Sequence, residues 1–360
     1  MIRADLNEPL VPAFGVALNG TLLGKDVAGW IARVLVEDDL DVPGMFTFEL
    51  ISKEDLNGTA PWTDDSRFSL GMNVSVSFGY GDQLEAVISG EITALEPAFH
   101  VGGPPTLLVR GYDVRHRLNA ARRTRAFVDA TDSQIAEQIC KSANVKIDAT
   151  DSKVQHKSVL QAGQTDLDFL LDRARRIQFE LAVEGDKLLF RPAGNTAKPA
   201  DGMAFTFRDD LLEFNPRLSL VPVTQTRLLF WDSKEKAPAT ATATTVGAVG
   251  AMEGRQSESQ AAGAVFTIAD QTTETDVDVV VASQPEADQV AQAKFNTAAL
   301  DYVRGDGACR GCTGLRAGAV MSLDGLGKRF SGNYYITSVV HSYTRRDGYL
   351  TQFRVQRNES

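Results

Sequence analysis

The chain has 360 residues and carries a formal net charge of −10. This length is sufficient for two or more domains, and a composition of 43% hydrophobic and 23% charged residues is typical of a globular protein that buries substantial cores. The negative charge disfavours general binding to nucleic acid or to an anionic membrane surface.

The start of the chain lacks the basic residues and the apolar run of a secretory signal. No apolar stretch approaches the length that spans a bilayer. The three cysteines, Cys140, Cys309 and Cys312, are too few for a disulfide scaffold in a chain of this length. We therefore expect a protein that is made and folded in a cytoplasm and does not insert directly into a membrane.

Residues 12–113 have the pattern of short strands separated by turns. Every second side chain is apolar in 44–52 and in 72–78, the period of a half-buried strand. Turns that contain Gly or Pro separate the apolar stretches. Short strands at close spacing favour a sandwich or a barrel. The expected strands are 30–37, 44–52, 72–78, 84–95 and 106–112.

Residues 114–198 change to a mixed pattern. The stretch from Thr131 to Gln134 is a capping box, which predicts a helix through Ile135 and Ile139. A second helix is expected to begin near Asp166, with its apolar residues on one face and its charges matching the helix dipole. A hairpin of 179–183 with 187–191 follows, so this part is predicted to be a small α/β domain.

The last part returns to strands but contains an insertion. The segment 233–265 is rich in Ala, Thr, Gly and Ser and is too long for an ordinary loop, so it is expected to be a mobile loop, with an extended arm as the alternative. Ser283, Gln284 and Pro285 mark the start of a helix. Two β-rich halves suggest two related barrels, although no clean repeat links them.

Short motifs that could carry chemistry have simpler explanations. The glycine-rich stretches 20–25 and 325–328 lack the spacing of a phosphate-binding loop, and no serine sits in a nucleophile elbow. Cys309 and Cys312 form a single C-x-x-C, which predicts a pair of thiols in a loop rather than a zinc site. The carboxylates of Asp166, Asp168 and Asp172 could bind a divalent ion, but interaction with the helix dipole and with Arg175 and Arg176 is the preferred interpretation.

The histidines are also predicted to be structural. His100, His116, His156 and His341 each stand apart from any other metal-ligating or catalytic residue in sequence. The basic cluster 116–125 is either a solvated connection between domains or a contact with an acidic partner, and the sequence leaves both open. The sequence thus predicts no catalytic, cofactor-binding or metal-ligating residue, no cofactor, and a protein that is not an enzyme.

The stretch 331–355 is predicted to form a β-hairpin. Residues 334–343 form its first strand, 345–348 its turn and 349–355 its second strand. Strand alternation places His341 on one face with Tyr335, Thr337, Val339 and Tyr343. Such a mixed face suits a barrel wall or a subunit contact better than a catalytic pocket.

Two groups of motifs resemble a known family. The first consists of VRGYDVRHRL, TDSQIAEQI and QTDLDFLLDRARRIQFELAVEGDKLLF, and the second of LRAGAVMSLDGLGKRFSGNYYITSVVHSYTRRDGYLTQFRVQRN. They resemble the late control gene D family of phage tail-hub proteins, most closely the hubs of extracellular contractile injection systems, and the N-terminal hub part of VgrG proteins. The resemblance covers nearly the whole chain; it is weak in 1–30 and absent across 233–265.

The resemblance implies a mainly β fold with α+β parts: two tube-like β-barrel domains plus a small α/β domain and a helical insertion. The expected domains are a first barrel in 1–115, the α/β domain in 116–200, a second barrel in 201–232 and 305–360, and the insertion in 233–304 with a helix at 285–303.

The resemblance also implies a structural function. Three copies would form a pseudo-sixfold ring that joins a threefold spike to the sixfold inner tube of a contractile injection particle. VgrG proteins continue past the hub, whereas this chain stops after its last strand, so the spike is expected to be a separate protein. The expected partners are two further copies of the chain, the inner-tube protein, the spike protein and baseplate components, with no specific nucleic acid. The particle would assemble in the bacterial cytoplasm. The alternatives are the tail hub of a DNA-delivering contractile phage and a cell-wall-binding or lytic tail-tip protein.

Overall fold

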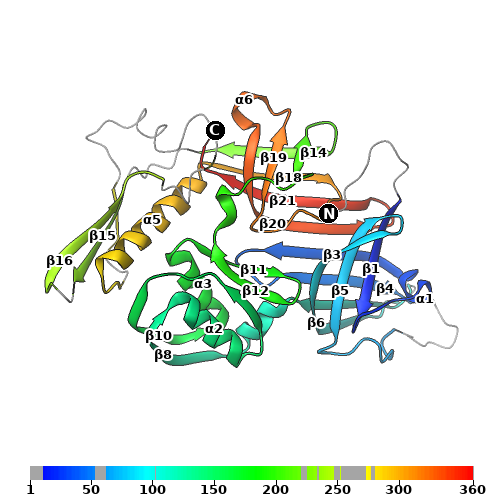
Figure 1. Cartoon of the computed structure of the whole chain (residues 1–360). Helices are drawn as coiled ribbons and strands as arrows, with labels where there is room; N and C mark the ends of the chain where they lie inside the picture. Colours follow the sequence, from blue (N-terminus) through cyan, green and yellow to red (C-terminus); the bar gives the residue numbers. More distant parts are fainter. Residues whose placement is uncertain are drawn as a thin grey trace.

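The computed structural model describes residues 11–52, 62–101, 103–219, 225–232, 235–246, 252, 273–276 and 280–359. Its centre is one sheet of thirteen strands in the described residues, which runs through both β-rich halves of the chain (Figure 1). The order is β14-β18-β21-β20-β3-β4-β7-β6-β5-β1-β2, and the pair β13-β19 attaches to β20. The mainly β fold class expected from the sequence is confirmed.

The first half of the sheet wraps around its own core. Its strands are β1 Pro12–Leu18, β2 Thr21–Leu22, β3 Ile31–Asp39, β4 Met45–Ile51, β5 Asn73–Tyr80, β6 Gln83–Ala98 and β7 Thr106–Tyr112, with the short helix α1 Lys25–Ala28. They confirm the five strands expected here. The alternating apolar residues, such as Phe46, Phe48 and Val76, are fully buried. At the far edge, β1 returns towards β20, where the rings of Phe14 and Tyr343 lie 4.7 Å apart.

The second half of the sheet encloses a second core. Its strands are β13 Ala204–Thr206, β14 Leu211–Leu218, β18 Val303–Arg310, β19 Val320–Asp324, β20 Gly332–Thr344 and β21 Gly348–Arg357, with α6 Gly327–Phe330 between β19 and β20. Phe205, Tyr334 and Leu323 are buried at its centre. The halves join where β20 pairs with β3, from Ser338 opposite Asp39 to Thr344 opposite Arg33.

In the view of Figure 1 the α/β domain lies below the second half of the sheet and to the left of the first half. It contains η1 Val114–Asn119, β8 Arg122–Thr131, α2 Asp132–Ser142, β9 Lys146–Ala149, β10 Gln155–Thr165, α3 Asp166–Arg176, β11 Phe179–Glu184, β12 Lys187–Pro192 and η2 Gly194–Thr196. The predicted capping box is confirmed: Thr131 Oγ1 accepts from the Gln134 amide, and Gln134 Oε1 accepts from the Thr131 amide. The helix expected near Asp166 begins at that residue, and the predicted hairpin is β11–β12.

The insertion is a third compact unit, which we call the arm. It contains β15 Gln225–Asp232, β16 Ala237–Ala243, β17 Thr273–Asp276 and α5 Gln284–Leu300. The structure differs from two of the sequence-based expectations here. Part of the segment 233–265, expected to be a mobile loop, is the strand β16, because small Ala side chains alternate with Thr and pack against α5. In addition, β15 lies in the range assigned to the second barrel but pairs with β16 and β17. The remainder of 233–265 lies outside the described residues, apart from 235–236, 244–246 and Met252. The division into domains stays a proposal.

The hairpin β20–β21 is shared by both cores. On β21, Tyr349, Thr351, Phe353 and Val355 are all buried, as their alternation predicted. Tyr349 packs in the first core, whereas Phe353 and Val355 pack in the second. The predicted alternation on β20 is partly wrong, because the strand register shifts between Ile336 and Ser338.

The shift changes which side chains of β20 face inwards. Val339 and His341 point inwards, but Thr337 is only half-buried, and Tyr335 joins a separate small cluster with Leu300 and Val320. A β-bulge places an extra residue in one strand and so breaks the period of two.

His341 holds a buried polar network inside this hairpin. Its Nε2 donates to the carbonyl of Leu315 at 3.1 Å, and its Nδ1 accepts from the Tyr349 hydroxyl at 2.9 Å. The ring also stacks on Phe78. Burial, aided by the nearby Arg316, lowers the pKa of His341 to about 3, so the ring is neutral at physiological pH.

We expect His341→Ala to lower the free energy of unfolding by about 2–4 kcal/mol, because it leaves a cavity and two unpaired polar groups. Chemical denaturation at pH 7 measures this loss. The role is structural, so a correctly assembled variant that had lost a hydrolase activity of the wild type would contradict it.

The burial of His341 is also expected to make the folded protein less stable in acid. In the unfolded chain the imidazole has a pKa near 6.5, so the unfolded state binds the proton first and stability falls as the pH drops from about 6.5 towards 3. This single group contributes a loss of about 3 kcal/mol between pH 7 and pH 4. His341→Gln cannot titrate, so its unfolding free energy should fall by that much less over the same range. Equal losses in the two proteins would rule out the assignment.

Candidate functional site

The two halves of the sheet and the α/β domain meet at Arg115. This side chain is 1% exposed. Its Nε and Nη2 donate to Asp113 Oδ2 at 2.9 and 2.8 Å, and its Nη1 donates to the carbonyls of Asp39 at 2.7 Å and Leu181 at 3.2 Å. One guanidinium therefore connects β3 of the first barrel with β11 of the α/β domain.

Asp113 organises the backbone around this contact. Its Oδ1 accepts from the Arg115 amide at 2.8 Å and so caps η1, and its Oδ2 also accepts from the Gly44 amide at 2.7 Å. The same carboxylate thus fixes the turn before β4 and the start of η1. Charge-assisted hydrogen bonds of this kind are roughly twice as strong as neutral ones.

The second barrel joins the junction through Asp38 and Arg316. Asp38 Oδ2 accepts from the Ala317 amide at 3.1 Å, and Arg316 donates to the carbonyls of Ala86 and Val87 on β6. Burial raises the pKa of Asp38, although Arg115 and Arg316 oppose this effect. The loop before β19 is thereby tied to β3 and β6.

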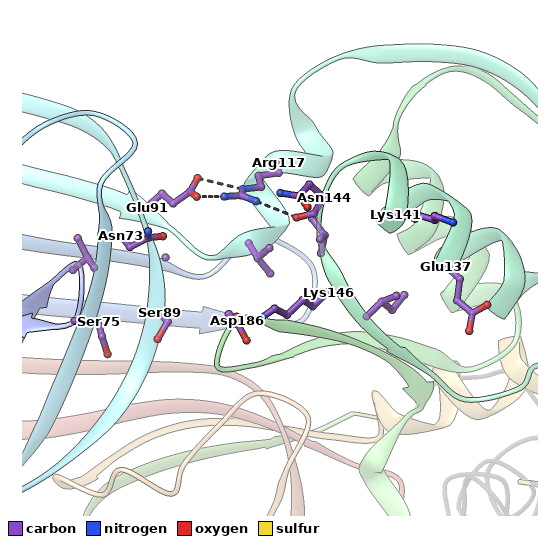
Figure 2. A pocket seen from close by; sticks show the side chains of 16 residues that line it. Asn73, Ser75, Ser89, Glu91, Arg117, Glu137, Lys141, Asn144, Lys146 and Asp186 are labelled. Atoms are coloured by element: carbon purple, nitrogen blue, oxygen red, sulfur yellow. Dashed lines mark hydrogen bonds and ion pairs between the residues drawn. The ribbon is translucent and has the colours of Figure 1, made fainter.

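Two cavities flank the turn between β11 and β12. One of about 330 Å³ is lined by residues that include Asp38, Ser89 and Arg316. The other, of about 660 Å³, lies between β5, β6, α2 and β9 (Figure 2). Figure 2 shows Arg117 reaching from η1 to Glu91 and Asn144, while Lys141 stands on α2 across the cavity. Charges of both signs line this cavity, which suits contact with polar protein groups.

The sheet presents a continuous polar face on the side away from its cores. A groove of about 500 Å³ crosses the β20–β3 seam on this face. Residues from β3, β14, β18, β20 and β21 line it, with Arg354 among four carboxylates, those of Glu37, Asp39, Glu213 and Asp306. The face belongs to both barrels at once, because the strands that form it are hydrogen-bonded from one half to the other.

Comparison with known families identifies the chain. Residues 11–345 match the family model Alg8_N, described as the Alg8 N-terminal domain. The chain belongs to the Alg8 N-terminal domain family. That description names a domain and states no activity. A search of curated proteins found no match.

Solved structures show that this family member has the fold of phage tail proteins. The 43 kDa tail protein of prophage MuSo2 from Shewanella oneidensis is similar with a TM-score of 0.70 and 16% identity over 96% of this chain and 98% of that chain. A tail protein from Neisseria meningitidis MC58 gives 0.68 and 12%, over 97% of each chain. The E. coli c3393 protein, described as a component of the type VI secretion system, gives 0.60 and 14%, over 96% and 77%. At these identities the likeness establishes the fold, and the late control gene D assignment stays a prediction.

The structure accounts for the histidines within the fold. His116 contacts the Asp113 carbonyl and Glu91, His156 is buried among charged groups, and His100 is exposed. No helix in the described part of the chain is long and apolar enough to cross a membrane. In the same residues, no group of three or more His, Cys, Asp or Glu side chains is placed to hold a metal ion.

The basic cluster 116–125 is bound mainly to carboxylates of the chain itself. Arg117 pairs with Glu91, and both Arg123 and Arg125 pair with the buried Asp166, at 3.3 and 2.5 Å. These contacts favour a structural role over contact with an acidic partner. They also explain Asp166, which the sequence left as a possible cation ligand.

The other carboxylates and the thiols are likewise part of the scaffold. Asp172 lies 3.9 Å from Arg175, as expected, while Arg176 turns instead to Glu286. The expectation of a thiol pair in a loop is wrong for Cys309, which lies in β18, and both Cys309 and Cys312 are fully buried in the second core.

We expect Arg115→Met to lower the free energy of unfolding by about 3–5 kcal/mol, because it leaves the Asp113 carboxylate buried without its counter-charge. The matched control is Arg117→Met in the same short helix, whose partly exposed pair with Glu91 is worth about 1 kcal/mol or less. Denaturant unfolding of the three proteins side by side gives both values. Similar losses for the two variants would show that the junction does not depend on Arg115.

Proposed function

We propose that the chain is a structural hub of a contractile injection particle or phage-tail-like baseplate. The observation that carries this proposal is the likeness of its fold, over 96% of the chain, to tail proteins and to a type VI secretion component. The likeness covers both barrel-like halves of the sheet, the α/β domain and most of the arm, so it extends beyond a single shared module.

The arrangement of the sheet supports a ring. Each subunit contains two barrel-like halves held in one sheet, so three subunits present six such halves. A ring of six halves made by three subunits would join a threefold spike to a sixfold inner tube. The proposed assembly is a homotrimer that binds the inner-tube protein, a separate spike protein and baseplate components.

The proposed role is structural rather than enzymatic. The groups best suited to acid–base chemistry are engaged in the fold: His341 and His156 are buried in hydrogen-bonded networks, and Asp166 is held by arginines. We assign the polar face that crosses the seam to the inside of the ring, where its mixed charges would let polypeptide pass without strong binding. The particle would assemble in the bacterial cytoplasm.

The tail hub of a DNA-delivering contractile phage is the second candidate. It is favoured by the prophage tail protein among the similar structures. The genes that accompany this one distinguish the two: capsid and terminase genes indicate a phage, whereas an ATPase and toxin genes indicate an injection system.

We expect the purified chain to form a trimer of three 39.0 kDa subunits at high concentration and to bind assembled inner-tube protein. Light scattering coupled to gel filtration gives the mass, and co-sedimentation with tube protein gives the binding, with tube protein alone as the control. A strict monomer that does not bind the tube would contradict the proposal. A peptidoglycan zymogram tests the lytic alternative, and a negative result retires it.

A further inference from the structure

The arm has a core of its own. Leu228 and Phe230 of β15 and Ala241 of β16 pack against Val290 and Phe295 of α5, and all five are buried. In Figure 1 the strands β15 and β16 lie on the side of α5 that faces away from the body. The strands of the arm therefore pack on α5 in a cluster separate from the cores of the body.

One end of α5 is attached to the body by apolar contacts. Leu300 packs in a small cluster with Met252, Val320 and Tyr335, and the chain enters β18 of the second barrel at Val303. Because these contacts are short-range and lie beside the covalent connection, this end remains in place if the arm turns. We call this end the pivot.

The other end of α5 is attached by charges. Glu286, in the first turn of α5, is 6% exposed. Its Oε1 lies 3.4 Å from His156 Nδ1 and 3.3 Å from Arg176 Nη2, and Arg176 Nη2 also donates to the carbonyl of Val280 at 2.8 Å. We call the contact of Glu286 with His156 and Arg176 the latch. About 14 residues of helix, roughly 21 Å, separate it from the pivot.

We propose that the arm is a movable module that turns about the pivot and is held against the α/β domain by the latch. Buried ion pairs contribute little net stability but depend strongly on geometry, so such a contact has a formed and a broken state rather than a graded one. Polar interfaces between domains of one chain permit relative motion. A further hydrogen bond between α5 and the α/β domain, from Asn296 Nδ2 to Gln178 Oε1, joins two neutral side chains.

The charges around the latch make it sensitive to pH. The groups that face His156 are Asp132 of α2, Arg173 and Arg176 of α3, and Glu286 of α5. Burial alone would lower the pKa of His156, but its hydrogen bonds to Asp132 and Glu286 outweigh burial and raise that pKa, while Arg173 opposes them.

The protonated ring donates to both carboxylates. As the pH rises through the raised pKa, the ring loses one proton and the charge that strengthens both bonds. The neutral ring retains a single donor, so the latch is strongest below about pH 6.5 and weakens above it.

Spin-label distance measurements on the full chain test the latch. Labels on cysteines placed at Thr240 of β16 and Lys141 of α2, both exposed, report the position of the arm relative to the α/β domain, and the native cysteines are buried. We expect Glu286→Ala and Arg176→Gln each to raise the population of a second distance by about threefold or more. Arg176→Gln is informative because Arg176 lies in α3, so this variant breaks the latch without changing any residue of the arm.

The matched control is Asp288→Ala. Asp288 is exposed, lies two residues further along α5 and accepts a hydrogen bond from Gln284 of the same helix, so its loss removes the same charge without touching the latch. We expect the wild-type distance distribution for this variant. Raising the pH from 6 to 9 should shift the wild type in the same direction as Glu286→Ala, and His156→Gln should show no such shift.

Three outcomes would overturn the proposal. The first is an unchanged distribution in both Glu286→Ala and Arg176→Gln. The second is equal broadening in Asp288→Ala, which would indicate a general effect of charge on α5. The third is loss of amide-exchange protection in β15 and β16 together with the change in distance, because Glu286 would then support the fold of the arm rather than its position.

Discussion

The arrangement of this protein depends on the burial of the Arg115 guanidinium. A buried charge is tolerated only when its donors are paired, and Arg115 is paired with the Asp113 carboxylate and with carbonyls of β3 and β11. The planar group fixes the direction as well as the distance of each partner. The α/β domain is therefore oriented on the sheet by polar contacts, while the apolar cores of the two units remain separate. The hydrogen bond from the Ala317 amide to Asp38 fixes the position of the second half of the sheet in the same way.

The protein thus combines two kinds of connection. The barrels share strands, and the hairpin β20–β21 contributes side chains to both cores, so they cannot separate without breaking the sheet. The arm meets the body mainly along the helix α5, which makes charged contacts near one end and packs in a small apolar cluster at the other. The two halves of the sheet are therefore fixed relative to each other, whereas the arm is attached by separate contacts.

Local patterns predicted much of the fold. The capping box at Thr131, the alternation in β4, β5 and β21, and the start of α3 depend on neighbouring residues, so the sequence contains them directly. The bulge beside Thr337 was not predictable, because the register of β20 is set by β3 and β21 together. The strand β16 was missed because its Ala and Pro residues disfavour strands, although its Thr residues favour them, and because its burial comes from α5. The partners of His156 were missed for a similar reason: Asp132, Arg173 and Glu286 come from three helices far apart in sequence.

The pairing of β20 with β3 has a consequence for how the protein is made. Ser338 pairs with Asp39, so about 300 residues must leave the ribosome between two strands that lie side by side. Until the C-terminal hairpin emerges, β3 has an open edge and the first core lacks Tyr349. An interrupted nascent chain would expose this edge and remain a substrate for chaperones and proteases. The strands that complete the contact between the two halves of the sheet are therefore among the last parts of the chain to be translated.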